Sequence, residues 1–335
     1  MGRQYGQQAR DAIQRNLDVM GIDRGEGDTT FARRTRRTLD RYAPALIPEI
    51  EGLAEGAGVS PSAIFRLNQV DTFGDAPTLD GCTSVIVRHA RGGPLIIKNN
   101  DGPIDGRGFV LRRSRPSSGL GLVQVTYAGC LSGLDAMNEA GLVNTHNSVG
   151  STFDRQGDRL DIRLWAYALM RRCATAADFA GALADAPLTG KGYNILAIDA
   201  EGHAQRIEAP VPRLFARSCD EAVVFATNHF VSDAYANADR RSPEAKRVSL
   251  DRCAYLAERI GDDPPTDDVG LKRLMTEHEG EGPCRHGEIG GFHTLWSMIA
   301  APQALRLEVA AGPPCQAAFD PVTVPRSAAI ADQPV

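Results

Sequence analysis

The order of the elements expected after residue 82 limits the fold of this chain more than any other feature of its sequence. Runs rich in β-branched and apolar residues occur in groups, and pairs of amphipathic stretches separate these groups. Strands and helices that alternate one by one build a parallel sheet, whereas grouped strands pair in antiparallel sheets and leave the helices outside. The order therefore predicts an α+β fold, with antiparallel sheets and helices packed on their outer faces.

Hydrophobic periodicity gives the expected bounds of the elements. Before residue 82, helical spacing predicts helices over residues 5–20 and 30–57, and Ser60-Pro61 is typical of an N-cap that begins a short helix through Leu67. The expected strands are 83–88, 95–98, 108–113, 121–127, 142–145, 193–199, 203–208, 222–227, 293–300 and 304–310. The helices expected after residue 82 are 159–173, one that begins at Thr175 with a T-x-x-D capping pattern, one from Ser242-Pro243 and one near Asp268.

Composition excludes several classes of protein. The 335 residues carry a formal net charge of −5, which argues against a nucleic-acid partner. The sequence has no apolar h-region typical of a signal peptide and no apolar run long enough to span a membrane, so no membrane partner is expected. The seven cysteines are odd in number and scattered without a C-x-x-C pair, which favours a reducing, cytoplasmic location over a disulfide framework.

One cysteine has an unusual position. In the stretch DGCTSVIV, the Asp80-Gly81 pair predicts a tight turn, and Cys82 becomes the first residue of the strand that follows. A thiol at that position suits a structural role, and it suits a nucleophile better if other parts of the chain supply polar partners.

Three polar residues at strand ends could supply those partners. Asp101 follows the second expected strand, where a hairpin would bring it beside Cys82, and Asn228 ends the strand VVFATN. Asn147 lies in THNS, after another strand. Taken singly, Asp and Asn after strands are usually turn residues. Their occurrence together with a thiol is what predicts a site.

A second group of side chains could hold a metal. His278, Cys284, His286 and His293 lie within EHEGEGPCRHGEIGGFH, and imidazole and thiolate ligands suit zinc. Their spacings match no zinc motif, and no C-x-x-C accompanies them. We therefore expect no metal here, and we expect Arg285 in CRHGE to point into a pocket or to pair with a carboxylate.

The chain resembles the isopenicillin-N acyltransferase family, the acyl-coenzyme A:6-aminopenicillanic acid acyltransferases, among the N-terminal nucleophile hydrolases. The matching segments, which run nearly end to end, are EIEGLAEGAGVSPSAIFRLN, GCTSVIV, IIKNNDG, MNEAGLVNTHNS, YNILAIDAEGHAQRIE, FATNHF, CRH and TLWSMIAAPQALRLEVAAGPPC. The resemblance implies a four-layer αββα fold and a precursor that cuts its own Gly81-Cys82 bond. Residues 1–81 would stay bound as a small chain, a heterodimeric partner, and residues 82–335 would form the catalytic domain.

The resemblance also implies roles for single residues. Cys82 is the expected nucleophile, Asp101 its acidic partner, and Asn228 the amide that stabilises the oxyanion. The residues expected in the oxyanion and substrate pocket are Thr83, Ser84, Asn147, His229 and Arg285. The penicillin-making members are fungal, whereas a sequence rich in Arg, Ala and Asp is more typical of a bacterial relative.

Cleavage before a cysteine solves a chemical problem. A thiol with a pKa of about 8.5 needs a base near neutral pH, and a new α-amine with a pKa of about 7.7–8.0 can serve. No metal or redox cofactor is then needed, and the expected substrate is a small linear amide or an acyl-CoA. Two alternatives remain open: an unprocessed thiol hydrolase that uses His229 or His146 as base, and a binding protein that has kept the fold without cleavage.

Overall fold

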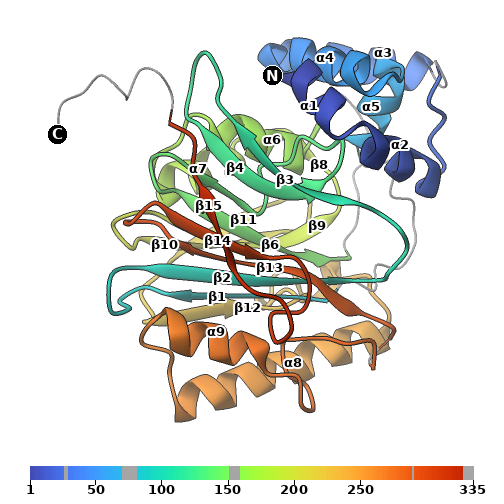
Figure 1. Ribbon diagram of the computed structural model, residues 1–335. Coiled ribbons are helices and arrows are strands. Elements are labelled where there is room, and N and C mark those ends of the chain that lie inside the picture. Colours follow the sequence, from blue (N-terminus) through green and yellow to red (C-terminus); the bar gives the residue numbers. More distant parts are fainter. Residues whose placement is uncertain (26–28, 70–80, 151–158, 289, 327–335) are drawn as a thin grey trace, which may run out of the picture.

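Two antiparallel sheets face each other, and helices cover the outer face of each sheet (Figure 1). The computed structural model describes residues 1–25, 29–69, 81–150, 159–288 and 290–326. One sheet has the strand order β12 (Val223–Ala226), β1 (Cys82–Val87), β2 (Leu95–Gly102), β13 (His293–Ala301), β14 (Arg306–Ala310) and β15 (Asp320–Thr323). The other has the order β11 (Phe215–Cys219), β10 (Ala204–Ala209), β9 (Gly192–Ile198), β6 (Val143–Val149), β5 (Ala136–Asn138), β4 (Leu122–Tyr127) and β3 (Phe109–Ser114).

The helices after residue 82 form the two outer layers. Helices α6 (Ile162–Met170) and α7 (Ala176–Ala184) cover the seven-stranded sheet, and α8 (Pro243–Asp262) and α9 (Asp268–Thr276) cover the six-stranded sheet (Figure 1). Thr175 caps α7 by accepting the Asp178 N–H at 3.0 Å, as its capping pattern predicts. The expected α+β class and the four αββα layers are confirmed.

Strand alternation decides what each layer buries. Successive side chains of a strand point to opposite faces, so Ile86 of β1 lies between the sheets while Val85 faces α9. The cluster between the sheets includes Ile96, Val123, Met137, Leu196 and Met298. The cluster under α9 includes Ile97, Leu271, Met275 and Ile299. By the same alternation Cys82 shares the inter-sheet face with Ile86.

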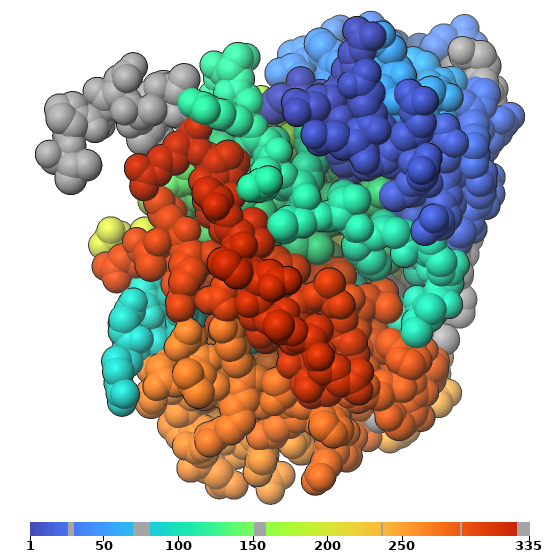
Figure 2. All heavy atoms as spheres, in the orientation of Figure 1, coloured from blue at the N-terminus to red at the C-terminus, as the bar shows by residue number. Residues whose placement is uncertain are grey.

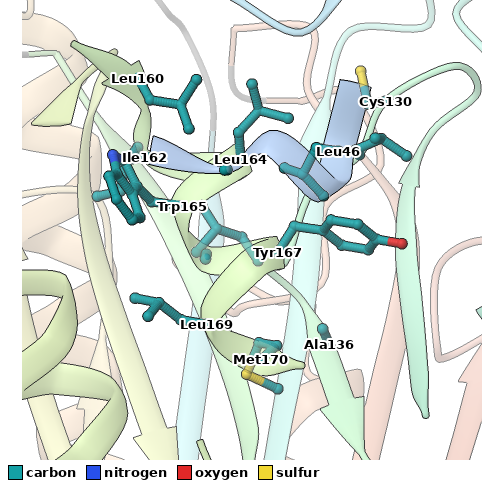
Figure 3. Packing of buried hydrophobic residues seen from close by; sticks show 14 of the residues in the cluster. Leu46, Cys130, Ala136, Leu160, Ile162, Leu164, Trp165, Tyr167, Leu169 and Met170 are labelled. Carbon is teal, nitrogen blue, oxygen red and sulfur yellow. The ribbon is translucent and has the colours of Figure 1, made fainter. Parts of the chain in front are cut away.

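The largest apolar cluster lies between the seven-stranded sheet, α6 and the N-terminal helices. Figure 3 shows its α6 part, where Leu164, Trp165 and Leu169 belong to the same cluster as Leu46 from the N-terminal region. Fully burying one such side chain contributes about 1.5–3 kcal/mol relative to exposure. This cluster therefore joins the N-terminal region to the layer built by residues after 82.

The N-terminal region differs from the sequence expectation. The helices predicted over 5–20 and 30–57 are each broken. The structure has α1 (Gly2–Gln8), α2 (Arg10–Val19), α3 (Thr29–Tyr42), a 3₁₀ turn η1 (Pro44–Leu46), α4 (Ile47–Ala57) and α5 (Pro61–Leu67). Pro44 cannot donate a backbone hydrogen bond, so α3 ends before it. The expected cap of α5 is confirmed, because Ser60 accepts the Ala63 N–H at 3.1 Å.

Other differences concern the strands. The second strand runs to Gly102 rather than to residue 98, so Asp101 lies inside β2 and not beyond it. β2 pairs with both β1 and β13, and these two ladders hold its polar end in strand geometry. The strands β5, β11 and β15 and the short parallel pair β7 (Leu160–Asp161) and β8 (Leu188–Thr189) were not expected. The Asp80 half of the expected turn lies outside the described residues.

The N-terminal helices cap one end of the molecule. Figure 2 shows them in blue against the green and teal part of the chain. The Tyr5 hydroxyl accepts the Gly129 N–H at 2.8 Å, and Asn16 donates to the carbonyls of Gly108 and Ala128, both at 3.0 Å. Buried Glu49 of α4 pairs with Arg112 of β3 and accepts the Tyr167 hydroxyl at 2.8 Å. Buried polar groups thus bind this region to the sheets, in addition to the apolar cluster.

Among the residues that the structure describes, no helix is both long enough and apolar enough to cross a membrane.

Candidate active site

The Gly81–Cys82 peptide bond is held from both sides. Cys82 begins β1 and pairs in register with Asn100 of β2. On one side of the bond, the Gly81 carbonyl accepts the Asp101 backbone N–H at 2.7 Å. On the other side, the Cys82 N–H donates to Oδ1 of Asn228 at 2.8 Å. The hairpin from β1 to β2 therefore places Asp101 beside Cys82, as the sequence predicted.

The Cys82 thiol is buried at the end of the inter-sheet space. Its side chain is 2% exposed, and Sγ lies 3.7 Å from Oδ1 of Asn100, which accepts the S–H. The acceptor of the S–H is thus a neutral amide oxygen, which cannot remove the proton from the thiol.

The Asn228 side chain has a fixed orientation. It lies two residues beyond the end of β12, in contrast to the prediction that it ends that strand. Its Oδ1 accepts both the Cys82 N–H and Nη2 of Arg252, the latter at 2.6 Å. Its Nδ2 donates to the Ser148 carbonyl at 2.8 Å, and its backbone N–H donates to Oγ of Ser249 at 2.8 Å. One of the two hydrogens on Nδ2 is thus engaged by Ser148.

The Asp101 carboxyl lies on the opposite face of β2 from the thiol. Its Oδ1 accepts the Thr294 hydroxyl at 2.7 Å, and its buried Oδ2 has no hydrogen-bond partner among the described residues. Burial raises the pKa of Asp101 to about 6, while the charges of Arg252 and Arg285 and the Thr294 bond oppose that rise. This carboxyl can therefore change charge close to neutral pH.

Arg252 of α8 completes the polar group around Gly81, and the sequence analysis missed it. It is 1% exposed, and its Nη1 would lie 3.2 Å from a Cβ placed on Gly81. Burial lowers the pKa of Arg252 to about 10, with Arg285 acting in the same direction. The available signal was helical spacing, because Ser249, Arg252 and Leu256 share the buried face of α8.

Arg285 approaches the site through its backbone. Its N–H donates to Oγ1 of Thr294 at 2.8 Å, and that hydroxyl donates to Asp101. Its buried guanidinium pairs with Glu281 at 3.2 Å, as the expectation of a carboxylate partner had it. Thr294 and Asn100 are further residues of the site that the sequence analysis missed. Asn100 was missed because the second strand was expected to end at residue 98. Thr294 was missed because its strand was not expected to pair with β2.

Three of the expected pocket residues lie along β1 and β6. Oγ of Ser84 donates to Oδ1 of Asn147 at 3.3 Å, so these two residues link the two sheets. Nδ2 of Asn147 is buried and has no partner among the described residues. Thr83 points to the other face of β1, and its hydroxyl is also buried without a described partner. Ser84 and Asn147 thus share the inter-sheet face with the thiol, and Thr83 does not.

The two histidines considered as bases direct their Nδ1 atoms elsewhere. Nδ1 of His229 lies 2.9 Å from Oγ of Ser249, and burial lowers the pKa of His229 to about 4. Nδ1 of His146 lies 2.8 Å from Asp135, within a buried group that includes Lys98, and burial lowers the pKa of His146. Both rings are neutral near pH 7.

The four layers, with a cysteine at the first residue of the inner strand β1, are those of the N-terminal nucleophile hydrolases, the class that the resemblance implied. Residues 88–316 match the family model described as acyl-coenzyme A:6-aminopenicillanic acid acyl-transferase. This match spans more than half of the chain, and the chain belongs to that family. No curated protein matches the chain in sequence.

Several solved structures resemble the chain at low identity. A mutant of the conjugated bile acid hydrolase from Clostridium perfringens has a TM-score of 0.45 and 10% identity, and the likeness covers 73% of this chain and 98% of that one. Penicillin V acylase from Agrobacterium tumefaciens has a TM-score of 0.45 and 15% identity, covering 69% and 83%. A Caenorhabditis elegans orthologue of N-acylethanolamine-hydrolyzing acid amidase has a TM-score of 0.42 and 12% identity, covering 66% and 93%. These likenesses are distant and carry no argument about activity.

Proposed function

We propose that this protein is a self-processing cysteine amidohydrolase or acyltransferase that cuts its own Gly81–Cys82 bond and then uses Cys82 as an N-terminal nucleophile. One observation carries the proposal. The carbonyl of that single peptide bond and the nitrogen of that same bond each have a hydrogen-bond partner on a different element, Asp101 on β2 and Asn228 after β12. A peptide bond held at both ends keeps one geometry, which favours attack on its carbonyl carbon by the sulfur of the same cysteine.

The self-cleavage step follows from these contacts. The deprotonated sulfur of Cys82 adds to the Gly81 carbonyl carbon, and the negative charge develops on the oxygen that faces the Asp101 N–H. The carbon–nitrogen bond then breaks, and the nitrogen takes up the proton that the thiol released to become the α-amine of Cys82. Water hydrolyses the resulting thioester, which leaves a carboxylate on Gly81 and a free thiol on Cys82.

The mature reaction repeats the same attack on an external substrate. The neutral α-amine of Cys82 removes the thiol proton, and the sulfur attacks an amide or thioester carbonyl to give an acyl-enzyme. The second hydrogen on Nδ2 of Asn228 and a backbone N–H at Thr83 or Ser84 would stabilise the oxyanion. Removing one such donor typically costs on the order of 10²–10³ in rate. Water releases the acyl group as an acid, and an amine releases it as a new amide.

The other residues of the site act on charge and position. Arg252 donates to the same oxygen of Asn228 as the Cys82 nitrogen does, so it fixes the direction of that amide. Ionised Asp101 balances the two buried guanidinium groups of Arg252 and Arg285. Ser84 and Asn147 line the inter-sheet side of the thiol, where the acyl group would enter. The substrate class is a small linear amide or an acyl-CoA, and residues 1–81 would remain bound as a small subunit.

Intact mass measurement with N-terminal sequencing tests the proposal. We expect purified wild-type protein to contain two chains, the second of which begins C-T-S-V, and Cys82→Ala to remain one chain. Cys173→Ala is the matched control, since it removes another buried thiol outside the site and should be cleaved as wild type. Cleavage of Cys82→Ala at the same bond, or full activity in an uncut wild-type chain, would contradict the proposal.

A further inference from the structure

A group of thiol and imidazole side chains lies outside the candidate active site. Cys284 and His286 come from the loop between α9 and β13, and Cys315 comes from the loop between β14 and β15. β13 and β14 are antiparallel neighbours, and β15 lies next to β14, so these two loops meet at the same end of the strands. The sequence analysis grouped His293 with these residues, but His293 meets His286 through a backbone bridge. The possible ligands that lie together are His278, His286 and Cys315, and Cys284 lies beside the last two.

The distances among Cys284, His286 and Cys315 fit three corners of a tetrahedral metal site. The two sulfur atoms of Cys284 and Cys315 are 3.6 Å apart. Nε2 of His286 lies 3.6 Å from the first sulfur and 3.1 Å from the second. Zinc bonds of about 2.3 Å to sulfur and 2.0 Å to nitrogen give edges of roughly 3.8 Å between sulfurs and 3.5 Å between sulfur and nitrogen. All three separations lie within a few tenths of an ångström of those edges.

His278 offers a fourth ligand. Its ligand atom lies within 4.8 Å of those of His286 and Cys315, and its ring approaches that of His286 with a centroid distance of 5.2 Å. Nδ1 of His278 lies 3.0 Å from the Thr276 carbonyl, to which it donates. That bond leaves the lone pair on Nε2, which is the arrangement that zinc-binding histidines have when a backbone carbonyl orients the ring.

We infer that His278, Cys284, His286 and Cys315 bind a structural Zn²⁺ ion, contrary to our expectation from the sequence spacing alone. Two thiolates and two imidazoles form a closed tetrahedral set with no position left for a reacting water. Each cysteine releases its proton to solvent as its sulfur bonds to the metal, so two protons leave for each ion bound.

The inferred site has a consequence for the loop between α9 and β13. Described residues of this loop form no helix or strand beyond the His286–His293 bridge. Arg285 lies between two of the ligands, and its N–H reaches Asp101 through the Thr294 hydroxyl. Zinc would therefore hold the loop whose backbone supports the Asp101 carboxyl, without touching the reacting atoms.

Metal analysis of the full chain, purified without a histidine tag from zinc-supplemented medium, tests the inference. We expect roughly one zinc per chain by elemental mass spectrometry. The same value is expected for Cys82→Ala, so the result does not depend on self-cleavage or on the proposed function. Cys315→Ser and Cys284→Ser should each lose most of the metal. Cys253→Ser removes a free cysteine of α8 outside the cluster, and His293→Ala removes the excluded histidine; both should keep it.

Cobalt provides a second readout that does not depend on the variants folding. Co²⁺ added to metal-free wild-type protein should give intense d–d bands and a thiolate-to-cobalt charge-transfer band, as tetrahedral cobalt with sulfur ligands does, and Zn²⁺ should displace it. Wild-type protein that carries no zinc and gives no thiolate–cobalt band would overturn the inference. A Cys284–Cys315 disulfide would also overturn it, if peptide mapping found that bond in protein expressed in a reducing cytoplasm and alkylated at lysis.

Discussion

The backbone nitrogen of Cys82 lies 2.8 Å from Oδ1 of Asn228, although 146 positions separate the two residues in sequence. In the intact chain this nitrogen belongs to a peptide bond. Under the proposed function it becomes an α-amine, which can still donate to the same oxygen. A single contact would therefore hold the nitrogen before and after cleavage.

Replacing Asn228 should impair both cleavage and turnover. Asn228→Ala removes the acceptor for the Cys82 nitrogen and the proposed oxyanion donor, so we expect both rates to fall by on the order of 10²–10³. Asn228→Asp keeps an acceptor beside Arg252 but loses the amide donor, and it should retain more cleavage than turnover. The rates are measured by intact mass over time and by steady-state kinetics. Wild-type rates in Asn228→Ala, with an unchanged unfolding midpoint, would remove Asn228 from the mechanism.

The rate of self-cleavage should rise with pH through about 6. The pKa of Asp101 is raised to about 6, chiefly by burial, and the ionised form balances Arg252 and Arg285 beside the Gly81–Cys82 bond. Protonation at lower pH removes that balance, so cleavage slows. Cleavage followed by mass spectrometry across this pH range should show the limb in wild type and lose it in Asp101→Asn. If the rise in cleavage rate near pH 6 persists in Asp101→Asn, the titration of another group causes it.

Stability should respond to Asp101 in the opposite direction. A carboxyl whose folded pKa lies above its unfolded value of 3.8 binds its proton more tightly in the folded state. Its contribution to the free energy of unfolding therefore grows as pH falls from about 6 towards 4. The comparison of wild type with Asp101→Asn by denaturant unfolding at several pH values isolates this group. If cleavage slows as the pH falls while the contribution of Asp101 to the free energy of unfolding grows, the slower cleavage reflects a loss of catalysis and not a loss of folded protein.

A side chain at position 81 should slow cleavage. A Cβ at Gly81 would lie 3.1 Å from Oδ2 of Asp101 and 3.2 Å from Nη1 of Arg252, so one of these groups would have to move. We expect Gly81→Ala to slow cleavage at least about tenfold, since overpacking typically costs about 1–3 kcal/mol. Gly181→Ala in α7 is the control, because nothing lies within 4 Å of its Cβ position. Equal cleavage of the two variants would show that the close approach has no role.

The sequence predicted that Asp101 lies beside Cys82, and it missed Arg252 on α8 as well as Asn100 and Thr294 on strands. A hairpin fixes the neighbours of a strand end, so the proximity of Cys82 and Asp101 could be derived from local patterns. Helical spacing indicates which face of α8 is buried, but the position of Arg252 over the sheet also depends on the axial position of that helix, and no local pattern determines that. Cys315 shows the same limit, because its approach to Cys284 follows from sheet order and not from spacing.

Neither histidine considered as a base should be required for cleavage. His229 and His146 direct Nδ1 to Ser249 and Asp135, and the lowered pKa of each makes the ring a weaker base. We expect His229→Gln and His146→Gln to be cleaved within a few-fold of the wild-type rate, measured by mass spectrometry. Loss of cleavage in one of them, with an unchanged unfolding midpoint, would favour the histidine-base alternative.

The N-terminal region should depend on close contact between α1 and α4. A Cβ on Gly56 would lie 2.2 Å from the Arg3 carbonyl oxygen, so the helices touch through their backbones. Gly56→Ala should push them apart, lower the free energy of unfolding by about 1–3 kcal/mol and, after cleavage, release the 1–81 fragment during gel filtration. Gly261→Ala near the end of α8, where nothing lies within 4 Å, should do neither. A bond cut at Gly81 leaves only non-covalent contacts to retain the fragment. If the Gly56→Ala protein keeps both its stability and its fragment, the α1–α4 packing is not required. Contacts such as Tyr5–Gly129 and Glu49–Arg112 would then be sufficient.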